Sequence, residues 1–320
     1  MVEIPERPCA PLQIAVSECL LGAPVRFDGG HKKSALPHEA LAGLFTFVGL
    51  CPEVAIGLGT PREPIRLEGD SDKPRAIAGQ ARIDITEKLQ AEAERVTPAL
   101  KNVSGYVLMK NSPSCGLFRV KVFPASGIPQ AAGRGIYAQQ VSVQQPDLPL
   151  EECGRLFDPV LRENFVMRTF VYAHWQSLKE SGLTAGKLIE FHSRYKYLLM
   201  AHSIGHYQSC GRLLGNLATR LDAVSREYFS SLMVGLTKIA TRGGHANVLS
   251  HLQGYVKDAL PAEDRQELAE VIEDYRQGST PLLAPLTLLR HHLKRYADDY
   301  ALHQAYLDPH PEAAGLRRAL

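Results

Sequence analysis

The sequence lacks an apolar run long enough to cross a bilayer, since none reaches the roughly 18 residues that a membrane helix needs. Residues 1–8 also lack the apolar core of a secretory signal. We therefore expect a cytoplasmic protein that is not bound to a membrane. No two of its six cysteines have C-x-x-C spacing. Outside a secreted chain, this argues against a disulfide framework and favours metal binding, catalysis or burial.

A strong charge imbalance is absent too, because the net charge is only +2. The apolar fraction of 45% is ordinary for a globular protein and excludes a disordered or fibrous chain. With 320 residues, the chain is long enough for two domains. The overall composition gives no further indication of function.

The first half alternates strand-like and helical patterns. Short apolar runs at residues 14–18, 45–50 and 107–110 each stop abruptly at Gly, Pro or an acid, as buried strands do. A capping sequence at 84–87 opens an amphipathic helix to about residue 103. This order predicts an α/β domain with a parallel, Rossmann-like sheet over residues 10–148.

Each of these strands is followed by a cysteine: Cys19, Cys51 or Cys115. In open α/β sheets, ligands bind at the carboxyl ends of the strands, so we expect the three thiols to converge there. Any one of them alone would more often be a small buried apolar residue. Three thiolates together suit a 4Fe-4S cluster with one iron left open.

A polar stretch rich in Gln and Pro, at about residues 133–150, predicts the end of this domain. Beyond it, apolar residues recur at helical spacing from about residue 160, and new helices are expected from Thr184, from about residue 261 and from about residue 283. The second domain is therefore predicted to be all-α, over residues 160–315.

Three segments of the first half resemble the signature segments of the thiouracil desulfidase (TudS) family, in the same order. They are residues 17–22, residues 51–54 with 60–64, and residues 112–116. The chain departs from the family pattern at Glu18 and Val25, and neither position is one of the presumed ligands.

This resemblance implies a 4Fe-4S cluster held by Cys19, Cys51 and Cys115, with the thiocarbonyl sulfur of the substrate bound to the open iron. It also implies desulfidation by water without net redox change, with a carboxylate and a hydroxyl handling protons. We expect Glu53 to be the carboxylate, and Ser112 or Ser114 the hydroxyl. An ion pair with a neighbouring arginine is the structural alternative for Glu53, and turn capping is the alternative for the serines.

Residues 191–202 and 244–255 carry a helical pattern rich in His, Tyr and basic residues, and through these two segments the second half resembles the helical YbgA-type domain over most of residues 187–305. Residues 187–257 carry nine Lys or Arg against three acids. Basic groups interleaved with aromatics suit phosphate contact and base stacking, so we predict an RNA-binding role. The candidate residues are Arg194, Tyr195, Lys196, Tyr197, His245 and His251; a solvated helix face with inward tyrosines is the structural alternative.

The combined hypothesis is desulfidation of 4-thiouridine in tRNA to uridine with release of sulfide. One alternative is a desulfidase for free thiouracil or a thionucleoside. Its helical domain would then serve oligomerisation, for example as a homodimer. The other is a non-catalytic, metal-containing protein that binds nucleic acid. We do not expect DNA as a partner. His202, His206 and Cys210 lie four residues apart, which allows a zinc site, but helical histidines are more often core or surface groups.

Overall fold

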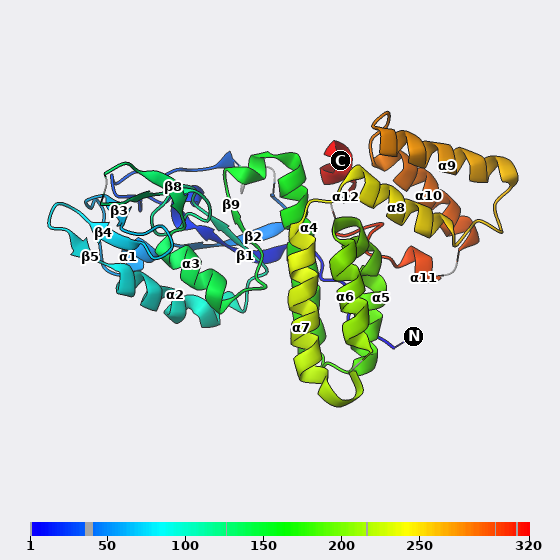
Figure 1. Ribbon diagram of the computed structural model, residues 1–320, viewed down its shortest axis with the longest axis horizontal. Helices are drawn as coiled ribbons and strands as arrows, with labels where there is room; N and C mark the ends of the chain where they lie inside the picture. The colour runs from blue at the N-terminus through cyan, green and yellow to red at the C-terminus, as the bar shows by residue number, and fades with distance from the viewer. Residues whose placement is uncertain (1, 36–40, 126, 216, 298, 312) are drawn as a thin grey trace. The chain divides into compact units, whose positions relative to one another are not determined.

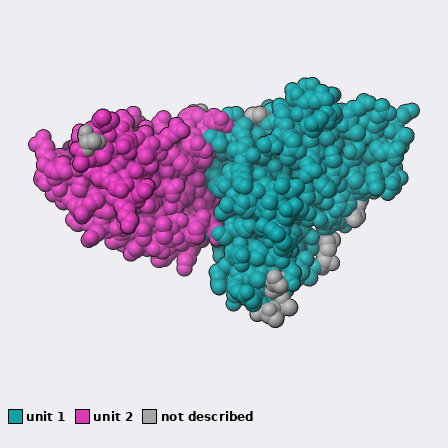
Figure 2. Space-filling view, in the orientation of Figure 1, with its two compact units in different colours: residues 1–8, 159–320 teal, residues 9–158 magenta. Residues whose placement is uncertain are grey.

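The computed structural model describes residues 2–35, 41–125, 127–215, 217–297, 299–311 and 313–320 (Figure 1). The chain folds into two compact units, coloured separately in Figure 2. We call residues 9–158 the α/β unit, and residues 1–8 together with 159–320 the helical unit. These classes confirm the predicted α/β and all-α halves. The α/β unit continues to residue 158, beyond the polar stretch, because one more strand follows that stretch.

The first sheet of the α/β unit is parallel and has the strand order β2-β1-β6-β9. Its strands are β1 (Leu12–Ser17), β2 (Phe45–Leu50), β6 (Tyr106–Leu108) and β9 (Leu150–Glu152). Ile14, Ala15 and Val16 in the central strand β1 are fully buried. A strand covered on both faces must be apolar at consecutive positions, which is why it appears in the sequence as an unbroken apolar run.

A second, mixed sheet was not predicted. It has the order β5-β4-β3-β7-β8, in which only β3 and β7 pair in parallel. Its strands are β3 (Ile65–Glu68), β4 (Arg75–Ala78), β5 (Ile83–Asp84), β7 (Val120–Phe123) and β8 (Gln130–Gly133). Strands β3, β4 and β5 follow the predicted strand at 45–50, and β7 and β8 follow the predicted strand at 107–110.

The helices of the α/β unit are α1 (Pro52–Ala55), α2 (Thr86–Leu100) and α3 (Ile136–Gln144), with the short 3₁₀ helices η1 (Glu18–Leu21) and η3 (Arg155–Phe157). The predicted helix at 84–103 corresponds to α2. The carboxylate of Asp84 accepts a hydrogen bond from the Thr86 N–H at 2.9 Å and so supports the start of this helix. Leu89, Ala93 and Val96 form its buried face.

The helical unit contains α4 (Pro159–Glu180), α5 (Ala185–His202), α6 (Ile204–Leu214), α7 (Leu217–Thr237), α8 (Arg242–Gln253), α9 (Ala262–Gln277), α10 (Leu283–Tyr296), α11 (Asp299–Leu302), α12 (Ala313–Leu316) and the 3₁₀ helix η4 (Arg317–Ala319). Thr184 caps α5 by accepting a hydrogen bond from the Lys187 N–H. Gly278 ends α9 in the left-handed conformation, with φ of 93°.

Aromatic rings form the core of this unit. Trp175 stacks on Phe229 with ring centroids 4.6 Å apart, and its edge meets Phe191. Glu163 and Arg317 form a buried ion pair at 3.0 Å. Among the described residues, no helix has both the length and the apolar character that a membrane span requires.

Candidate metal centre

Three strand ends bring Cys19, Cys51 and Cys115 to one edge of the first sheet. The last residues of β1 and β2 lie opposite each other, so the chain leaves both strands at the same level. β6 lies on the other side of β1, and the Ser17 hydroxyl at the end of β1 accepts a hydrogen bond from the Met109 N–H at 3.0 Å. As a result, η1, the start of α1 and the loop after β6 surround a common space.

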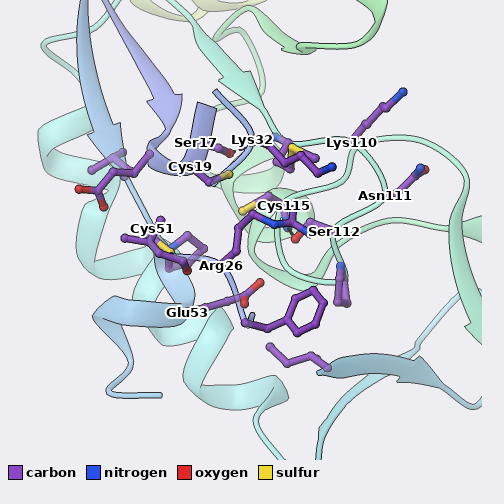
Figure 3. A pocket seen from close by; sticks show the side chains of 18 of the residues that line it. Ser17, Cys19, Arg26, Lys32, Cys51, Glu53, Lys110, Asn111, Ser112 and Cys115 are labelled. Atoms are coloured by element: carbon purple, nitrogen blue, oxygen red, sulfur yellow. Dashed lines mark hydrogen bonds between the residues drawn. The ribbon is translucent and has the colours of Figure 1, made fainter. Parts of the chain in front are cut away.

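That space is a cavity of about 490 Å³, and all three cysteines line it (Figure 3). Cys19 and Cys115 are buried and Cys51 is half-buried. The other lining residues are Ser17, Glu18, Val25, Arg26, Phe27, Lys32, Leu50, Pro52, Glu53, Arg62, Pro64, Ile65, Met109, Lys110, Asn111, Ser112 and Pro113. The structure therefore brings together the three cysteines predicted as metal ligands, at the predicted edge of the sheet.

Burial dominates the electrostatics of the three thiols. It raises the pKa of Cys19 to about 11, and the charge of Cys51 adds to this effect. Burial also raises the pKa of Cys51, and it raises that of Cys115 further, with contributions from Glu53 and the other two cysteines. Thiolates at these positions therefore need a positively charged partner.

The donor set fits an iron-sulfur cluster, since all three side chains are soft sulfur donors from separate loops around one cavity. Among the residues that the structure describes, no three His, Cys, Asp or Glu side chains close around a single ion. Cysteines spread around a cavity of this size suit a polynuclear cluster better than one metal ion.

Glu53 lines the same cavity and forms an ion pair. Its Oε2 accepts hydrogen bonds from Arg62 Nη2 at 2.5 Å and Nε at 3.0 Å. The Arg62 side chain is 6% exposed, and the same Nη2 also donates to the Val25 carbonyl at 2.9 Å. Arg62 thus fixes one carboxylate oxygen, while the other oxygen receives no hydrogen bond from the described residues.

The two candidate serines have different environments. Ser112 lines the cavity, and its Oγ accepts hydrogen bonds from the backbone N–H groups of Ser114 and Cys115 at 3.2 and 3.0 Å. Because both bonds use its oxygen as the acceptor, the Ser112 hydroxyl proton is available for donation. Ser114 is fully buried and does not line the cavity. Of the two serines, the structure therefore supports only Ser112 as a group that reaches substrate.

In the helical unit, the aromatic candidates for RNA stacking are buried, which corrects the prediction for them. Tyr195 is 1% exposed, and its hydroxyl bonds His174 Nδ1 at 2.8 Å. Tyr197 is 6% exposed, and its hydroxyl bonds that of Tyr255 at 3.0 Å. Neither ring presents a free face to a base, because each packs inside the unit.

The two histidine candidates also differ in exposure. His245 is 3% exposed and bonds the Tyr306 hydroxyl at 3.1 Å, so it is a core residue. Burial lowers its pKa to about 3, which keeps the ring neutral. His251 is exposed, and its ring lies 6.2 Å from that of Tyr197.

The two basic candidates are partly engaged within the unit. Arg194 forms an ion pair with Glu190 at 3.5 Å. The Lys196 ammonium lies 4.9 Å from the Tyr197 ring and 5.2 Å from the Tyr300 ring. Both side chains are half-buried.

The residues with zinc-like spacing bond to different protein groups. His202 Nδ1 bonds the Lys238 carbonyl at 2.6 Å, and His206 Nδ1 bonds the Ser203 hydroxyl at 2.9 Å. Cys210 is buried against the main chain of α7. These three side chains do not form a common site among the described residues.

Three exposed side chains at the mouth of the cavity were not predicted from the sequence: Phe27, Lys32 and Lys110. Phe27 and Lys32 follow the signature segment at 17–22 in the same Gly-rich region, and Lys110 lies two residues before the segment at 112–116. The available signal was an aromatic residue in a Gly-rich loop, and a lysine directly before the loop that carries Cys115.

Known proteins resemble the two units separately. The family model for 2-thiouracil desulfurase matches residues 14–153, and a model described as a protein of unknown function, DUF1722, matches residues 196–311. The uncharacterized protein YbgA of Escherichia coli K12 is 35% identical over 159 residues, covering 49% of this chain and 94% of YbgA. The uncharacterized protein YbbK of Bacillus subtilis 168 is 35% identical over 111 residues, covering 32% of this chain and 72% of YbbK.

Among solved structures, a 4Fe-4S-dependent thiouracil desulfidase named TudS aligns with 27% identity and a TM-score of 0.36. The alignment covers 46% of this chain and 95% of that one. The family matches define the class of protein, which is a thiouracil desulfurase domain joined to a second, helical domain. The chain belongs to the YbgA family, and its α/β unit matches the 2-thiouracil desulfurase family over residues 14–153.

Proposed function

We propose that the chain removes sulfur from a thiolated uracil base by hydrolysis, with a 4Fe-4S cluster held by Cys19, Cys51 and Cys115. One observation carries this proposal: three cysteines from three adjacent strand ends line one cavity together with a carboxylate, within a domain of the 2-thiouracil desulfurase family. When bound, a cluster with three cysteine ligands supplies one open iron, a Lewis-acid position for the thione sulfur of the base.

The side chains of the cavity supply the proton chemistry. Glu53 has one oxygen fixed by Arg62, so its second oxygen is held in a defined position to orient water and accept its proton. The Ser112 hydroxyl donates its proton in a hydrogen bond to the substrate, because backbone N–H groups already occupy its oxygen.

The reaction balances without a redox partner. The water oxygen forms a bond to the ring carbon, the carbon–sulfur bond breaks, and the sulfur leaves as hydrogen sulfide with the two protons of the water. A thione becomes a carbonyl, so 4-thiouridine becomes uridine. No external oxidant or reductant is required.

The preferred substrate in this proposal is 4-thiouridine within tRNA, because a free base would not require a second, basic domain. Residues 187–257 carry an excess of six positive charges, from nine Lys or Arg against three acids. Several of these groups are exposed on the helical unit: Arg212, Arg226, Lys238, Arg242 and Lys257. With Tyr195, Tyr197 and His245 buried, the helical unit's contribution is phosphate contact by these cations and not base stacking.

The test is anaerobic purification of the full chain with iron and sulfide analysis, followed by incubation with tRNA containing 4-thiouridine. We expect about four irons per chain, loss of the thione absorbance and release of sulfide in equal amount. Iron-replete protein that leaves both tRNA and free thiouracil unchanged would contradict the proposal.

The same experiment distinguishes the substrates. Free 4-thiouracil, 4-thiouridine and the tRNA are compared at equal thione concentration. A higher kcat/KM for tRNA supports an RNA desulfidase. Equal values, or a preference for the free base, would restrict the proposal to a small-molecule desulfidase.

A further inference from the structure

A second cavity, separate from the cysteine site, lies within the helical unit. It has a volume of about 280 Å³ and is lined by residues 2–4, by residues of α5, and by Tyr300, His303 and Gln304 in and just after α11 (Figure 1). Because liquid water occupies about 30 Å³ per molecule, a cavity of this volume can hold a small organic molecule.

The segment at residues 2–4 forms a fixed wall of this cavity. Val2 packs on the start of α5 at Gly186, where an added Cβ would come within 2.9 Å of the Val2 side chain. Just beyond the segment, His174 Nε2 donates to the Pro5 carbonyl at 2.8 Å. The segment is therefore attached to the helical core on both sides of the cavity lining.

One buried amide in the lining has an acceptor without a partner. Gln304 is 2% exposed, and its Nε2 donates to the Tyr300 carbonyl at 3.1 Å. Since a carbonyl can only accept, this bond fixes the amide with its nitrogen towards Tyr300 and its oxygen away from it. Oε1 is buried and has no hydrogen-bond partner within the part of the chain that the structure describes. A buried acceptor of this kind costs free energy until a donor reaches it.

Glu190, on α5, adds a carboxylate to the same lining. Its side chain is 14% exposed, and its ion-pair contact is with Arg194 Nε at 3.5 Å. This distance is longer than a hydrogen bond, and among the described residues Arg194 Nε has no hydrogen-bond partner. The pair contributes charge attraction only, so the carboxylate oxygens can still accept N–H groups of a ligand.

The remaining lining is apolar, and its charge is negative on balance. Glu3 and Glu190 face a single arginine, Arg194. Ile4 and Tyr300 supply apolar surface. Buried acceptors and an excess carboxylate match a ligand that carries both N–H groups and a positive charge, because hydrogen bonds between charged partners are the stronger ones.

We propose that this cavity is a binding site for a small organic cation, namely an amine or a guanidine with a short apolar chain. Its N–H groups donate to Gln304 Oε1 and to the Glu190 carboxylate, and its apolar chain lies against Ile4 and Tyr300. The inference concerns the helical unit and does not rest on the proposed desulfidation.

The experiment compares probes that share one alkyl chain and differ in the head group: n-butylamine, n-butylguanidine, n-butanol and butyrate. Each is titrated into the full chain at neutral pH, and binding is followed by saturation-transfer NMR of the probe. We expect both cations to bind with Kd of roughly millimolar order, as suits molecules of this size. Butanol and butyrate should bind about tenfold more weakly or not at all.

Variants locate the binding. Glu190→Gln keeps the shape of the side chain and removes its charge, so the Kd of both cations should rise by about 10- to 150-fold. Gln304→Leu removes the acceptor and should give a loss of the same order. Glu3→Gln, at an exposed position, should raise Kd by about fivefold or less. The matched controls Glu263→Gln and Gln266→Leu, both exposed on α9, should bind like the wild type.

Urea unfolding followed by the fluorescence of Trp175 shows whether each variant keeps its helical core. If a buried variant fails to fold, the probe comparison on the wild type and Glu3→Gln still decide the question. Equal binding of butanol and the cations would indicate an apolar cavity without charge selection, and stronger binding of butyrate would indicate an anion site at Arg194. Either result, no binding of any probe, or unchanged binding in folded Glu190→Gln and Gln304→Leu would overturn the inference.

Discussion

The α/β unit brings its motif residues together, whereas the helical unit places its motif residues in different environments. In the α/β unit, three cysteines spread over nearly a hundred residues line one cavity with Glu53. In the helical unit, residues that are neighbours in the sequence, such as Arg194 and Tyr195, have different partners: Arg194 forms a half-buried ion pair and Tyr195 a buried hydrogen bond.

The difference follows from the geometry of the two folds. Parallel strands all end at one edge of a sheet, so residues just after them meet whatever their separation in sequence. Consecutive residues of a helix point in different directions, so Tyr195 and Tyr197 do not form one surface with the lysine and arginine between and beside them. Convergence at strand ends is therefore the better indicator of a site.

The largest expected effect is the loss of a cysteine from the cavity. Cys115→Ser should lose the iron and all measurable desulfidation, a drop well beyond the about 10- to 100-fold that changes to outer partners of metal ligands cause. Cys9→Ser is the control, since this cysteine is exposed and lies outside the cavity. Iron content and sulfide release are measured together. Full iron content and activity in the Cys115 variant would show that the three cysteines do not act as one site, and the contrast between the two units would fail.

A smaller loss is expected from the carboxylate that faces the cavity. Glu53→Gln keeps the shape of the side chain but cannot accept a proton, so kcat should fall by about 100- to 10,000-fold with iron content unchanged. Glu87→Gln, at an exposed position on α2, serves as the matched control. If Glu53→Gln loses its iron in proportion to its activity, the carboxylate stabilises the centre and does not act on protons.

For the helical unit, we expect the free energy of unfolding to depend on pH. Burial lowers the pKa of His245 to about 3 and that of His174 to about 4, from an ordinary value of 6.5. The unfolded chain then binds protons that the folded unit does not, so stability is complete above pH 6.5 and falls as the pH drops towards 4. Each histidine contributes up to about 1.4 kcal/mol per pH unit in this window.

The chain's single tryptophan makes this measurable, because Trp175 lies in the helical core. Urea unfolding followed by its fluorescence at pH 7.5, 6 and 5 reports on the helical unit alone. A free energy of unfolding that stays constant over this range would show that the buried histidines are protonated in the folded state.

The smallest effect concerns a residue first expected to bind RNA. Tyr195→Phe removes the hydroxyl that bonds the buried His174 and should lower the free energy of unfolding by about 1–3 kcal/mol. RNA affinity should not change, because the ring has no exposed face. Arg212→Glu, on the surface of α6, should do the reverse. Weakened RNA binding by Tyr195→Phe at unchanged stability would restore the original prediction.

The sequence predicted β1, β2 and β6 of the first sheet and the cysteine site, because short apolar runs end near glycine, proline and cysteine; it did not predict β9. It did not predict the second sheet, since strands such as Ile83–Asp84 and Gln130–Gly133 are short and mostly exposed and carry no apolar alternation. The exposed side chains at the mouth of the cavity were also missed. Phe27 in a Gly-rich loop has no periodic context, and only the folded loop shows that its ring stays exposed beside the cavity.

The order in which β1, β2 and β6 are synthesised has a consequence for the protein while it is still on the ribosome. Residues 19, 51 and 115 leave the ribosome far apart in time, and β6 must pair with β1 before the third thiol joins the other two. A growing chain therefore exposes two cysteines, without their shared cavity, while the next sixty or so residues are made. In the function proposed above, the cluster is loaded after β6 has been made, and the thiols of shorter nascent chains remain open to oxidation.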